Sequence, residues 1–439
     1  MHTRISNLNA PSINKQRDMG VYLHIPFCRK KCSYCDFASY EGLEAYYDEY
    51  VGALCEEMRL WAQQYPESTT IPIKTVYFGG GTPTQLSLKQ LERILMTLKA
   101  YYDCNAMMEL SIEANPGEID KAYLQGLKAL GVTRLSYGVQ TFDDSLLTLL
   151  RRGHTSAMAK QAICDAIEVG FPSVSGDLIY ALPGQTLQDI ETNVENLLHL
   201  GVNHISIYGL QLEEGTNLHK EVELGHIQLP SDDENEAMYD SMLNTLGGHG
   251  FERYEISNST NNKAYSHHNL RYWQYEEYLA FGSGAYSFYR DVRRNNEPYV
   301  VPYINRIRQG LLPVVFEESI SVERAVEDYC FLALRTKWGL RADAFKERFN
   351  TDIFELFGHI LQQLRSQGLV ELYDTEETDM LPGLGENPWS HKAMNCNDGH
   401  SIPTDSDVLL TDGKNLAWRL TREGAKHGNY VFSQFLRDN

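Results

Sequence analysis

The 439-residue sequence lacks long hydrophobic runs and has no excess of basic residues. No stretch of about 18 apolar residues is present, which excludes a transmembrane helix. Lys and Arg number 39 against 59 Asp and Glu, and this charge of −20 argues against nucleic acid as a partner. The first 18 residues are polar and have no apolar segment of the kind that secretory signals carry. We expect 1–18 to be a disordered extension, with Met19 as an alternative start.

Cysteine is also scarce, with eight residues in the chain, and three of these fall within eight positions. Structural disulfides are not usually spaced in this way, so the pattern predicts a cytoplasmic protein with reduced thiols. The other five are scattered. Two of them, Cys55 and Cys164, lie in predicted helices, where we expect them to be packing residues.

Short β-rich runs alternate with amphipathic helical stretches from residue 21 onward. The six predicted strands are 21–25, 75–78, 109–114, 134–139, 177–182 and 204–210. Helices are predicted between them, for example from Ser156 to Gly170 and from a capping box at Thr186 to Gly201. Six βα repeats predict an α/β fold with a parallel sheet, closed as a partial (β/α)6 barrel. Its functional residues are then expected at the carboxyl ends of the strands.

The pattern of predicted secondary structure changes after about residue 310. Helices dominate there, and an acidic segment rich in Gly, Pro, Ser and Asn interrupts them. We expect a small, mainly helical, winged-helix-like C-terminal domain that ends in a single helix over 421–436. The acidic segment is predicted to be a solvated insertion. The predicted organisation is an extension (1–18), a core (19–255), a connecting region (256–310) and a C-terminal domain (311–439) with the insertion at 374–408.

The most specific motif is the CxxxCxxC spacing of Cys28, Cys32 and Cys35, directly after the first strand. Three thiolates on one tight loop can bind three corners of a [4Fe–4S] cluster, leaving one iron open. The alternatives are a zinc site completed by His24 or a set of ordinary buried cysteines. No second CxxC pair follows, which disfavours zinc.

Polar residues mark the ends of the next strands. Three successive glycines, 79–81, end the second strand, where they allow a ligand to approach the backbone and expose N–H groups. Glu113 lies at the end of the third strand, Gln140 ends the fourth, and Asp177 opens the fifth. Polar groups at such positions are costly unless they bind something polar. At equivalent heights they predict a lined pocket, although each alone is equally consistent with a hydrogen-bonded core residue.

Together with GGGTPT (79–84), SIEANP (111–116), GVQTF (138–142) and GDLIYALPGQT (176–186), the cysteine motif resembles the radical S-adenosylmethionine superfamily. The resemblance spans roughly 20–370 and the closing helix, and it is strongest to the branch related to oxygen-independent coproporphyrinogen III oxidase. It implies a [4Fe–4S] cluster whose open iron holds S-adenosylmethionine. The residues that it assigns to S-adenosylmethionine are Tyr22, Gly80, Gly81, Thr82, Glu113, Gln140, Arg152, Asp177 and, from strand spacing alone, Gln211.

One departure separates the branches. The oxidases continue as CxxxCxxCxC, whereas here Asp36 and Phe37 follow Cys35, so the fourth cysteine is missing. Residues 268–273 read HNLRYW, a pattern that resembles the HNxxYW motif of the HemW branch, whose members are described as haem chaperones. That resemblance makes His268 the candidate haem ligand. The chemistry alone favours a packing role, in which His268 and Asn269 cap a turn and the aromatic residues fill core.

Three functions therefore remain open at this stage. The resemblance favours a haem chaperone with haem-accepting respiratory proteins as clients, an electron donor for the cluster, and at most peripheral membrane association through clients. The alternative is an oxygen-independent coproporphyrinogen III dehydrogenase, which the missing cysteine disfavours. A radical enzyme that modifies RNA is the third, and the acidic charge balance argues against it.

Overall fold

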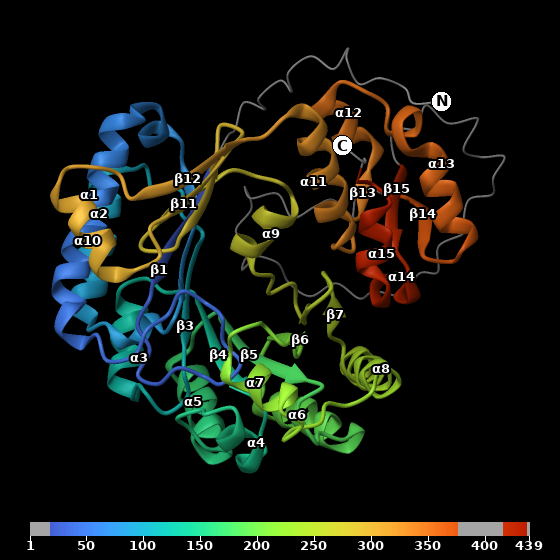
Figure 1. Cartoon of the computed structure of the whole chain (residues 1–439), viewed down its shortest axis with the longest axis horizontal. Coiled ribbons are helices and arrows are strands. Elements are labelled where there is room, and N and C mark those ends of the chain that lie inside the picture. The colour runs from blue at the N-terminus through green and yellow to red at the C-terminus, as the bar shows by residue number, and fades with distance from the viewer. Residues whose placement is uncertain (1–17, 376–415, 437–439) are drawn as a thin grey trace.

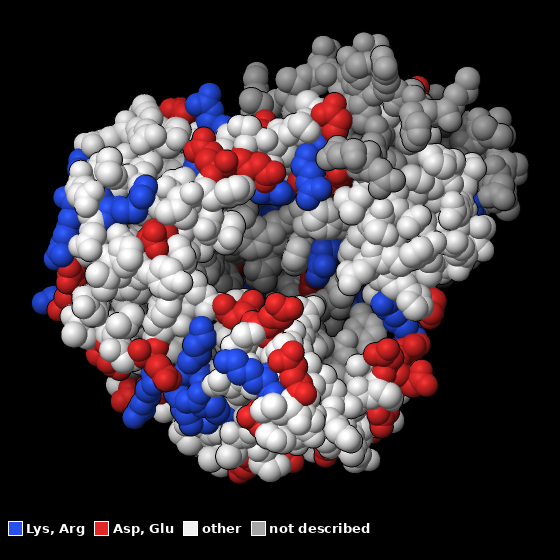
Figure 2. All heavy atoms as spheres, viewed as in Figure 1, with Lys and Arg blue, Asp and Glu red and all other residues white. Residues whose placement is uncertain are grey.

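The structure is a computed structural model that describes residues 18–375 and 416–436 (Figure 1). All of the predicted extension at 1–18 except Asp18, and most of the predicted insertion at 374–408, lie outside the described residues. A large open sheet with helices on its outer side forms one part, and a smaller, mainly helical part lies beside it. Between the two parts, the face seen in Figure 2 is hollowed, and acidic side chains gather along the rim. Within the described ranges, no helix is both long and apolar enough to span a membrane.

Six neighbouring parallel strands form the centre of the sheet, as predicted. They are β1 (Met19–Ile25), β2 (Ile73–Gly80), β3 (Glu109–Ala114), β4 (Arg134–Gln140), β5 (Ser173–Tyr180) and β6 (His204–Gly209). Most predicted boundaries lie within two residues of the observed ones, but β5 begins four residues before the predicted start, so Asp177 lies within the strand and does not open it. The interval 173–176 (Ser-Val-Ser-Gly) carries only one large apolar residue, which hid the start of the strand from a hydrophobicity pattern.

The sheet stays open, which confirms the partial barrel. Beyond β1 it continues through β9 (Tyr278–Phe281), β10 (Tyr286–Tyr289), β11 (Val292–Asn296) and β12 (Val314–Ser319). Beyond β6 it continues through β8 (Asn258–Thr260) and β7 (Glu252–Arg253). Strand β9 runs parallel to β1, whereas β10, β11 and β12 are antiparallel to their neighbours. Additional strands therefore occupy the edges through which a complete barrel would close.

Helices cover the outer side of this sheet. The α-helices of this part are α1 (Tyr47–Gln64), α2 (Leu88–Tyr101), α3 (Lys121–Ala129), α4 (Asp144–Leu149), α5 (Ser156–Val169), α6 (Leu187–Leu200), α7 (Asn217–Glu223), α8 (Asp232–Gly248), α9 (His267–Trp273) and α10 (Val300–Arg308). Three short 3-10 helices are η1 (Glu44–Tyr46), η2 (Pro66–Thr70) and η3 (Pro83–Gln85). The predicted capping box at Thr186 is present, and Gly170 and Gly201 adopt left-handed conformations that end α5 and α6.

The two faces of the central strands differ in chemistry, because side chains alternate along a strand. Val21, Leu23 and Ile25 of β1 are buried in a core shared with α1 and α2. The alternate residues, Tyr22 and His24, face the inside of the barrel, where the neighbouring side chains are also largely polar. The interior of this barrel is therefore a hydrogen-bonded polar lining rather than a packed apolar core.

The C-terminal part has a hydrophobic core of its own. It contains α11 (Val322–Leu334), α12 (Ala342–Phe349), α13 (Ile353–Ser366), α14 (Arg422–Lys426) and α15 (Gly428–Ser433), with an antiparallel sheet of β13 (Leu340–Arg341), β15 (Leu416–Leu420) and β14 (Val370–Asp374). The helical character was predicted correctly. The single closing helix was not: it is divided into α14 and α15 at His427, whose backbone is not helical.

Of the two cysteines expected to be packing residues, Cys55 of α1 is buried, but Cys164 of α5 is exposed. The prediction for Cys164 was wrong because Cys164 lies outside the apolar stripe of α5, which is formed by Ala159, Ala162, Ile163 and Ala166.

A buried carboxyl ties α1 to the antiparallel end of the sheet. Glu57 accepts hydrogen bonds from Gly282 N at 2.8 Å, from the Tyr303 hydroxyl at 2.6 Å and from Asn296 Nδ2 at 2.7 Å. Burial raises the pKa of Glu57 from 4.5 to about 8, against the opposing effect of these donors.

This raised pKa predicts a pH dependence of stability. Between about pH 4.5 and 8 the folded chain keeps a proton on Glu57 that the unfolded chain releases, so the unfolding free energy falls as pH rises. One such group contributes at most about 1.4 kcal/mol per pH unit. We expect Glu57→Gln to remove this contribution, measured as urea unfolding from pH 5 to 8. Glu92→Gln, on the exposed side of α2, is the control, and equal slopes in both variants would contradict the prediction.

Candidate functional site

The three motif cysteines lie on one loop at the carboxyl end of β1. The ends of this loop are fastened together, since Cys28 N donates to Tyr40 O at 2.9 Å and Tyr40 N donates to Pro26 O at 2.7 Å. Cys28, Cys32 and Cys35 are partly exposed, and Cys32 and Cys35 lie close enough to Cys28 to raise the pKa of its thiol. The structure therefore brings together the three sulfurs that the spacing predicted.

The surroundings of these thiols suit a metal cluster. Burial raises the pKa of the Cys28 thiol to about 11 and also raises that of Cys35. Coordination to iron deprotonates a thiol outright and so offsets this cost. Hydrogen-bond donors already point at two of the sulfurs: Thr82 Oγ1 lies 3.8 Å from Cys28 Sγ, and Arg152 Nη1 lies 3.2 Å from Cys32 Sγ.

The zinc alternative lacks its fourth ligand. His24 Nε2 donates to Ala38 O at 2.9 Å, and His24 Nδ1 accepts from the Tyr22 hydroxyl at 3.1 Å, so neither ring nitrogen is free. In the part of the chain that is described, no group of three or more His, Cys, Asp or Glu converges as ligands of a single ion would. In a [4Fe–4S] cluster each thiolate binds a different iron, so such convergence is not required. The donor set fits the cluster better than a single ion.

The glycine segment at the end of β2 packs against the cysteine loop without room for side chains. Gly80 has φ +111°, and a Cβ there would lie 2.6 Å from the His24 ring. A Cβ on Gly81 would lie 2.7 Å from Phe27 O and 3.0 Å from Cys28 Sγ. Both positions therefore require glycine.

The prediction that this segment exposes free N–H groups was wrong. Gly80 N donates to Glu113 Oε2 at 3.2 Å, Gly81 N to Ile25 O at 2.9 Å, and Thr82 N to Phe27 O at 2.7 Å. The segment is thus fixed by hydrogen bonds from within the fold, and what it offers a ligand is close backbone approach.

The two predicted carboxylates face the inside of the barrel. Glu113 Oε1 accepts from the Tyr77 hydroxyl at 2.7 Å, and Asp177 accepts from Ser136 Oγ at 3.1 and 3.2 Å. Burial raises the pKa of Glu113 to about 7, to which the Asp177 charge also contributes, and burial raises the pKa of Asp177 as well. A cationic group bound between them would favour the ionised forms.

The two carboxylates were predicted at equivalent heights along the strands, but their positions differ slightly. Glu113 pairs with Ser136 of β4, whereas Asp177 pairs with Gly138, two residues further along the same strand. Such a stagger is expected when strands tilt in a barrel. The two side chains still belong to one lining.

Arg152 links the cysteine loop to this lining. In addition to its contact with Cys32, its Nη2 donates to Asn115 Oδ1 and to Gly138 O, each at 2.6 Å. Asn115 Nδ2 in turn donates to Thr82 Oγ1 at 2.9 Å. Gln140 lies beside them, with φ +67° and its amide folded over Gly138. Tyr77 and Asn115 were not among the predicted site residues. The available signal for Tyr77 was its inward position in the alternation of β2, and that for Asn115 was its place directly after the end of β3.

Partial exposure distinguishes the site from the core around it. Apolar residues on the same strands are buried, whereas several polar site residues retain some exposure inside the mouth of the barrel: Tyr22, Gly80, Gly81, Glu113, Arg152 and Asp177. Gln211 does not share this position; it is exposed, two residues beyond the end of β6.

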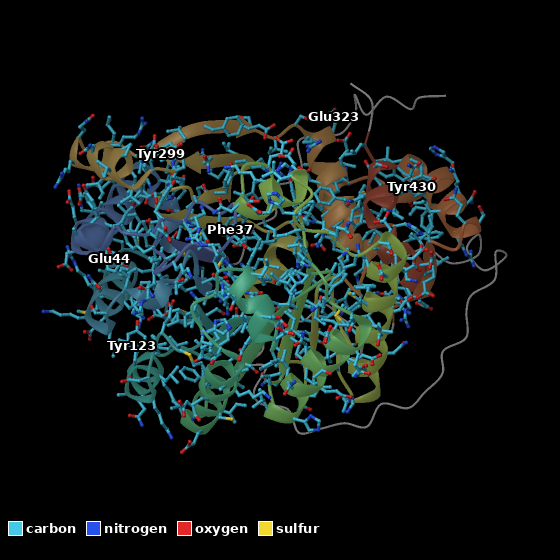
Figure 3. The ribbon with its side chains drawn as sticks, turned by 60° about the horizontal axis from the view of Figure 1, so that its bottom comes forward. Phe37, Glu44, Tyr123, Tyr299, Glu323 and Tyr430 are labelled. Atoms are coloured by element: carbon cyan, nitrogen blue, oxygen red, sulfur yellow. The ribbon has the colours of Figure 1, made fainter. Side chains whose placement is uncertain are left out.

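A hollow of about 600 Å³ adjoins the outer side of the cysteine loop. Its wall contains Cys32 and Cys35 and, across from them, residues 214–217 after β6. Asp36 also lines it, and the next residue, Phe37 (Figure 3), is 63% exposed. The cysteine loop is therefore accessible from the surface. The volume of the hollow lies within the range of small-molecule sites.

The HNLRYW segment forms α9, which lies between the sheet and the C-terminal part (Figure 1). Its candidate haem ligand, His268, is fully buried, and its two ring nitrogens hydrogen-bond to the hydroxyls of Thr75 at 2.9 Å and Tyr272 at 2.8 Å. Burial, and secondarily Arg271, lowers the pKa of His268 to about 3, so the ring is neutral. In this arrangement neither nitrogen is free to bind iron, which favours the packing role that the chemistry alone indicated.

Comparison with known proteins gives two family matches. Residues 22–197 match the Radical SAM superfamily, and residues 320–376 match the HemN C-terminal domain. The first match implies a [4Fe–4S] cluster and S-adenosylmethionine.

Curated relatives match over nearly their whole length. The heme chaperone HemW of Bacillus subtilis is 35% identical over 80% of this chain and 92% of that protein. The heme chaperone HemW of Lactococcus lactis is 34% identical over 85% and 96%, respectively. Among solved structures, coproporphyrinogen III oxidase (HemN) from Escherichia coli superposes with a TM-score of 0.75 at 20% identity, covering 96% of this chain and 90% of that one. At this identity the likeness establishes the fold alone.

Proposed function

Because this chain belongs to the HemW family within the radical S-adenosylmethionine superfamily, we propose that it is a haem chaperone that binds haem and passes it to haem-requiring respiratory proteins. The observation that carries the proposal is the extent of the family match, which spans 92% and 96% of two curated haem chaperones. We further propose that it acts in the cytoplasm and receives electrons from a separate donor protein.

In this proposal Cys28, Cys32 and Cys35 hold the cluster. When bound, the cluster supplies an open iron and a low-potential electron to S-adenosylmethionine. Arg152 donates to the Cys32 sulfur and thereby stabilises its thiolate. Thr82 does the same for Cys28.

The S-adenosylmethionine site is proposed above the polar lining of the barrel. Gly80 and Gly81 allow the ligand to approach the backbone, and Glu113 orients Gly80 by accepting its N–H. The Asp177 carboxylate, held by Ser136, offers an acceptor for a hydroxyl or ammonium group. Tyr22, Gln140 and Arg152 border the same space, and Gln211 is retained only as an outlying contact because it is exposed beyond β6.

The oxidase alternative is disfavoured by the residues after the motif. Asp36 and Phe37 stand where the oxidase pattern continues to a fourth cysteine, and neither is a thiol ligand. Since the structural likeness to the oxidase establishes only the fold, it gives no independent support to that activity.

We expect the reconstituted protein to bind haem and to transfer it to a haem-free client, without decarboxylating coproporphyrinogen III. The paired assay measures haem transfer by absorption spectroscopy and, in parallel, protoporphyrinogen formation with 5′-deoxyadenosine release. Haem-loaded serum albumin serves as the control for passive transfer. Robust turnover of coproporphyrinogen III would replace the chaperone proposal with the dehydrogenase.

A further inference from the structure

We propose that His268 is a positioning residue for the S-adenosylmethionine site and not a haem ligand, and that it acts through Tyr77 and Glu113. The inference rests on the proposed function, because that proposal places S-adenosylmethionine beside Gly80 and Glu113. What it adds is a role for the HNLRYW segment, which the chaperone proposal leaves without one.

The first link joins α9 to β2. His268 Nδ1 hydrogen-bonds to Thr75 Oγ1, and the imidazole stacks on the ring of Tyr77 with centroids 5.3 Å apart and an interplanar angle of 26°. Thr75 and Tyr77 are alternate residues of one strand, so both face the inside of the barrel. The hydrogen bond and the stacking together fix the position of the Tyr77 ring.

The second link runs from Tyr77 to the glycine segment. The Tyr77 hydroxyl donates to Glu113 Oε1 at 2.7 Å, and Glu113 Oε2 accepts the N–H of Gly80 at 3.2 Å. The carboxylate is therefore held between a side chain that His268 supports and the backbone at the ligand site. If Tyr77 moved, the hydrogen bond that orients Glu113 would be lost.

A second path reaches the same glycine through aromatic rings. Tyr77 stacks on Tyr22 with centroids 6.2 Å apart, and the Tyr22 hydroxyl donates to His24, whose ring lies under Gly80. We call His268, Tyr77, Tyr22 and His24 the ring ladder. It explains why residue 79 is also glycine, because a Cβ there would lie 2.9 Å from Tyr77 and 3.0 Å from Tyr22.

Helix α9, which carries His268 at one end of the ring ladder, is fixed by contacts with residues at the starts of several strands. Glu109 at the start of β3 accepts the N–H groups of His267 at 2.8 Å and His268 at 3.1 Å, at the amino-terminal end of α9. Arg271 of α9 is fully buried and pairs with Asp18, directly before β1, and with Glu276. The helix thus closes the amino-terminal end of the barrel, opposite the cysteine loop, and a haem at His268 would have to displace these contacts.

Two variants test the ladder. Tyr77→Phe removes only the hydroxyl that holds Glu113, and His268→Ala removes the ring that supports Tyr77. His267→Ala is the matched control, since His267 is also buried at the start of α9, its ring nitrogens have no hydrogen-bond partner among the described residues, and its ring contacts Tyr265, outside the ladder. In the cluster-loaded full-length protein, S-adenosylmethionine affinity is measured by equilibrium dialysis, and haem binding, cluster content and unfolding midpoint are recorded in parallel.

We expect Tyr77→Phe and His268→Ala each to weaken S-adenosylmethionine binding by about tenfold, as loss of one buried hydrogen bond predicts. The double variant should bind S-adenosylmethionine no more weakly than the weaker-binding single variant, because the hydroxyl of Tyr77 acts downstream of the ring that His268 supports. Haem bound per folded chain and iron per chain should match the control.

Unchanged S-adenosylmethionine affinity in Tyr77→Phe overturns the inference even if His268→Ala fails to fold. Loss of haem binding in His268→Ala, with S-adenosylmethionine affinity equal to that of His267→Ala, overturns it in favour of a haem ligand. Failure of the proposed function has a separate signature: the unaltered protein would then bind no haem or would oxidise coproporphyrinogen III.

Discussion

Replacing Cys28, Cys32 or Cys35 by alanine is expected to abolish cluster assembly, the largest single effect predicted for this chain. Each replacement removes one of three ligands, and His24, the alternative ligand that the zinc hypothesis used, has both ring nitrogens hydrogen-bonded. After anaerobic reconstitution the unaltered protein should hold about one [4Fe–4S] cluster per chain, and each variant only residual iron and sulfide.

Two other cysteines provide the controls for this experiment. Cys55 is buried in α1 and Cys164 is exposed on α5, and neither belongs to the cysteine loop. Their alanine variants should keep iron, sulfide and visible absorbance. Normal iron and sulfide in Cys32→Ala would mean that the cluster ligands have been misassigned.

Gly80→Val is expected to weaken S-adenosylmethionine binding by more than tenfold while the cluster persists. Its Cβ would meet the His24 ring at 2.6 Å, and valine tolerates φ +111° poorly, so both the ring ladder and the glycine segment must shift. Equilibrium dialysis of the reconstituted protein measures the affinity, and iron content measures the cluster.

The matched control separates backbone strain from the local clash. Gly131 also has positive φ, at +96°, but a Cβ there meets nothing within 4 Å. Gly131→Val should therefore cost stability without changing the affinity for S-adenosylmethionine. Glu113→Ala should weaken binding independently, because it frees the N–H of Gly80. If neither Gly80→Val nor Glu113→Ala changed the affinity, the pocket would lie elsewhere.

The elements that could be predicted are those with local signals. The six central strands follow from β-rich runs, and α6 (Leu187–Leu200) lies between Thr186 and Gly201 because a capping box marks its start and a glycine its end. The division of the closing helix at His427 was missed because Gly428, the glycine beside it, is itself helical and begins α15 instead of ending α14 in a left-handed conformation. The start of β5 was missed for the related reason that serine and glycine fill it.

The same difference between local and long-range signals separates the predicted residues of the candidate site from the missed ones. Spacing alone identified the three cysteines, since they lie within one loop. The contact between Thr75 and His268 joins residues 193 positions apart, and that between Tyr77 and Glu113 joins residues 36 positions apart. No periodicity encodes such pairs, because they depend on which strands become neighbours. This is why HNLRYW suggested haem from the sequence but forms the base of the ring ladder in the fold.

The hydrogen bonds that fix the cysteine loop have a consequence for loss and reassembly of the cluster. Its shape depends on hydrogen bonds that do not use the sulfurs: Cys28 N and Tyr40 O join its ends, Lys31 Nζ reaches the carbonyl groups of Phe37 and Ser39 at 3.0 Å, and Ser33 Oγ donates to Leu149 O at 3.1 Å. In a zinc finger, by contrast, the energy of metal binding is the energy of folding. We therefore expect the loop to keep its form when oxygen destroys the cluster, so that the same molecule can be refilled with iron and sulfide.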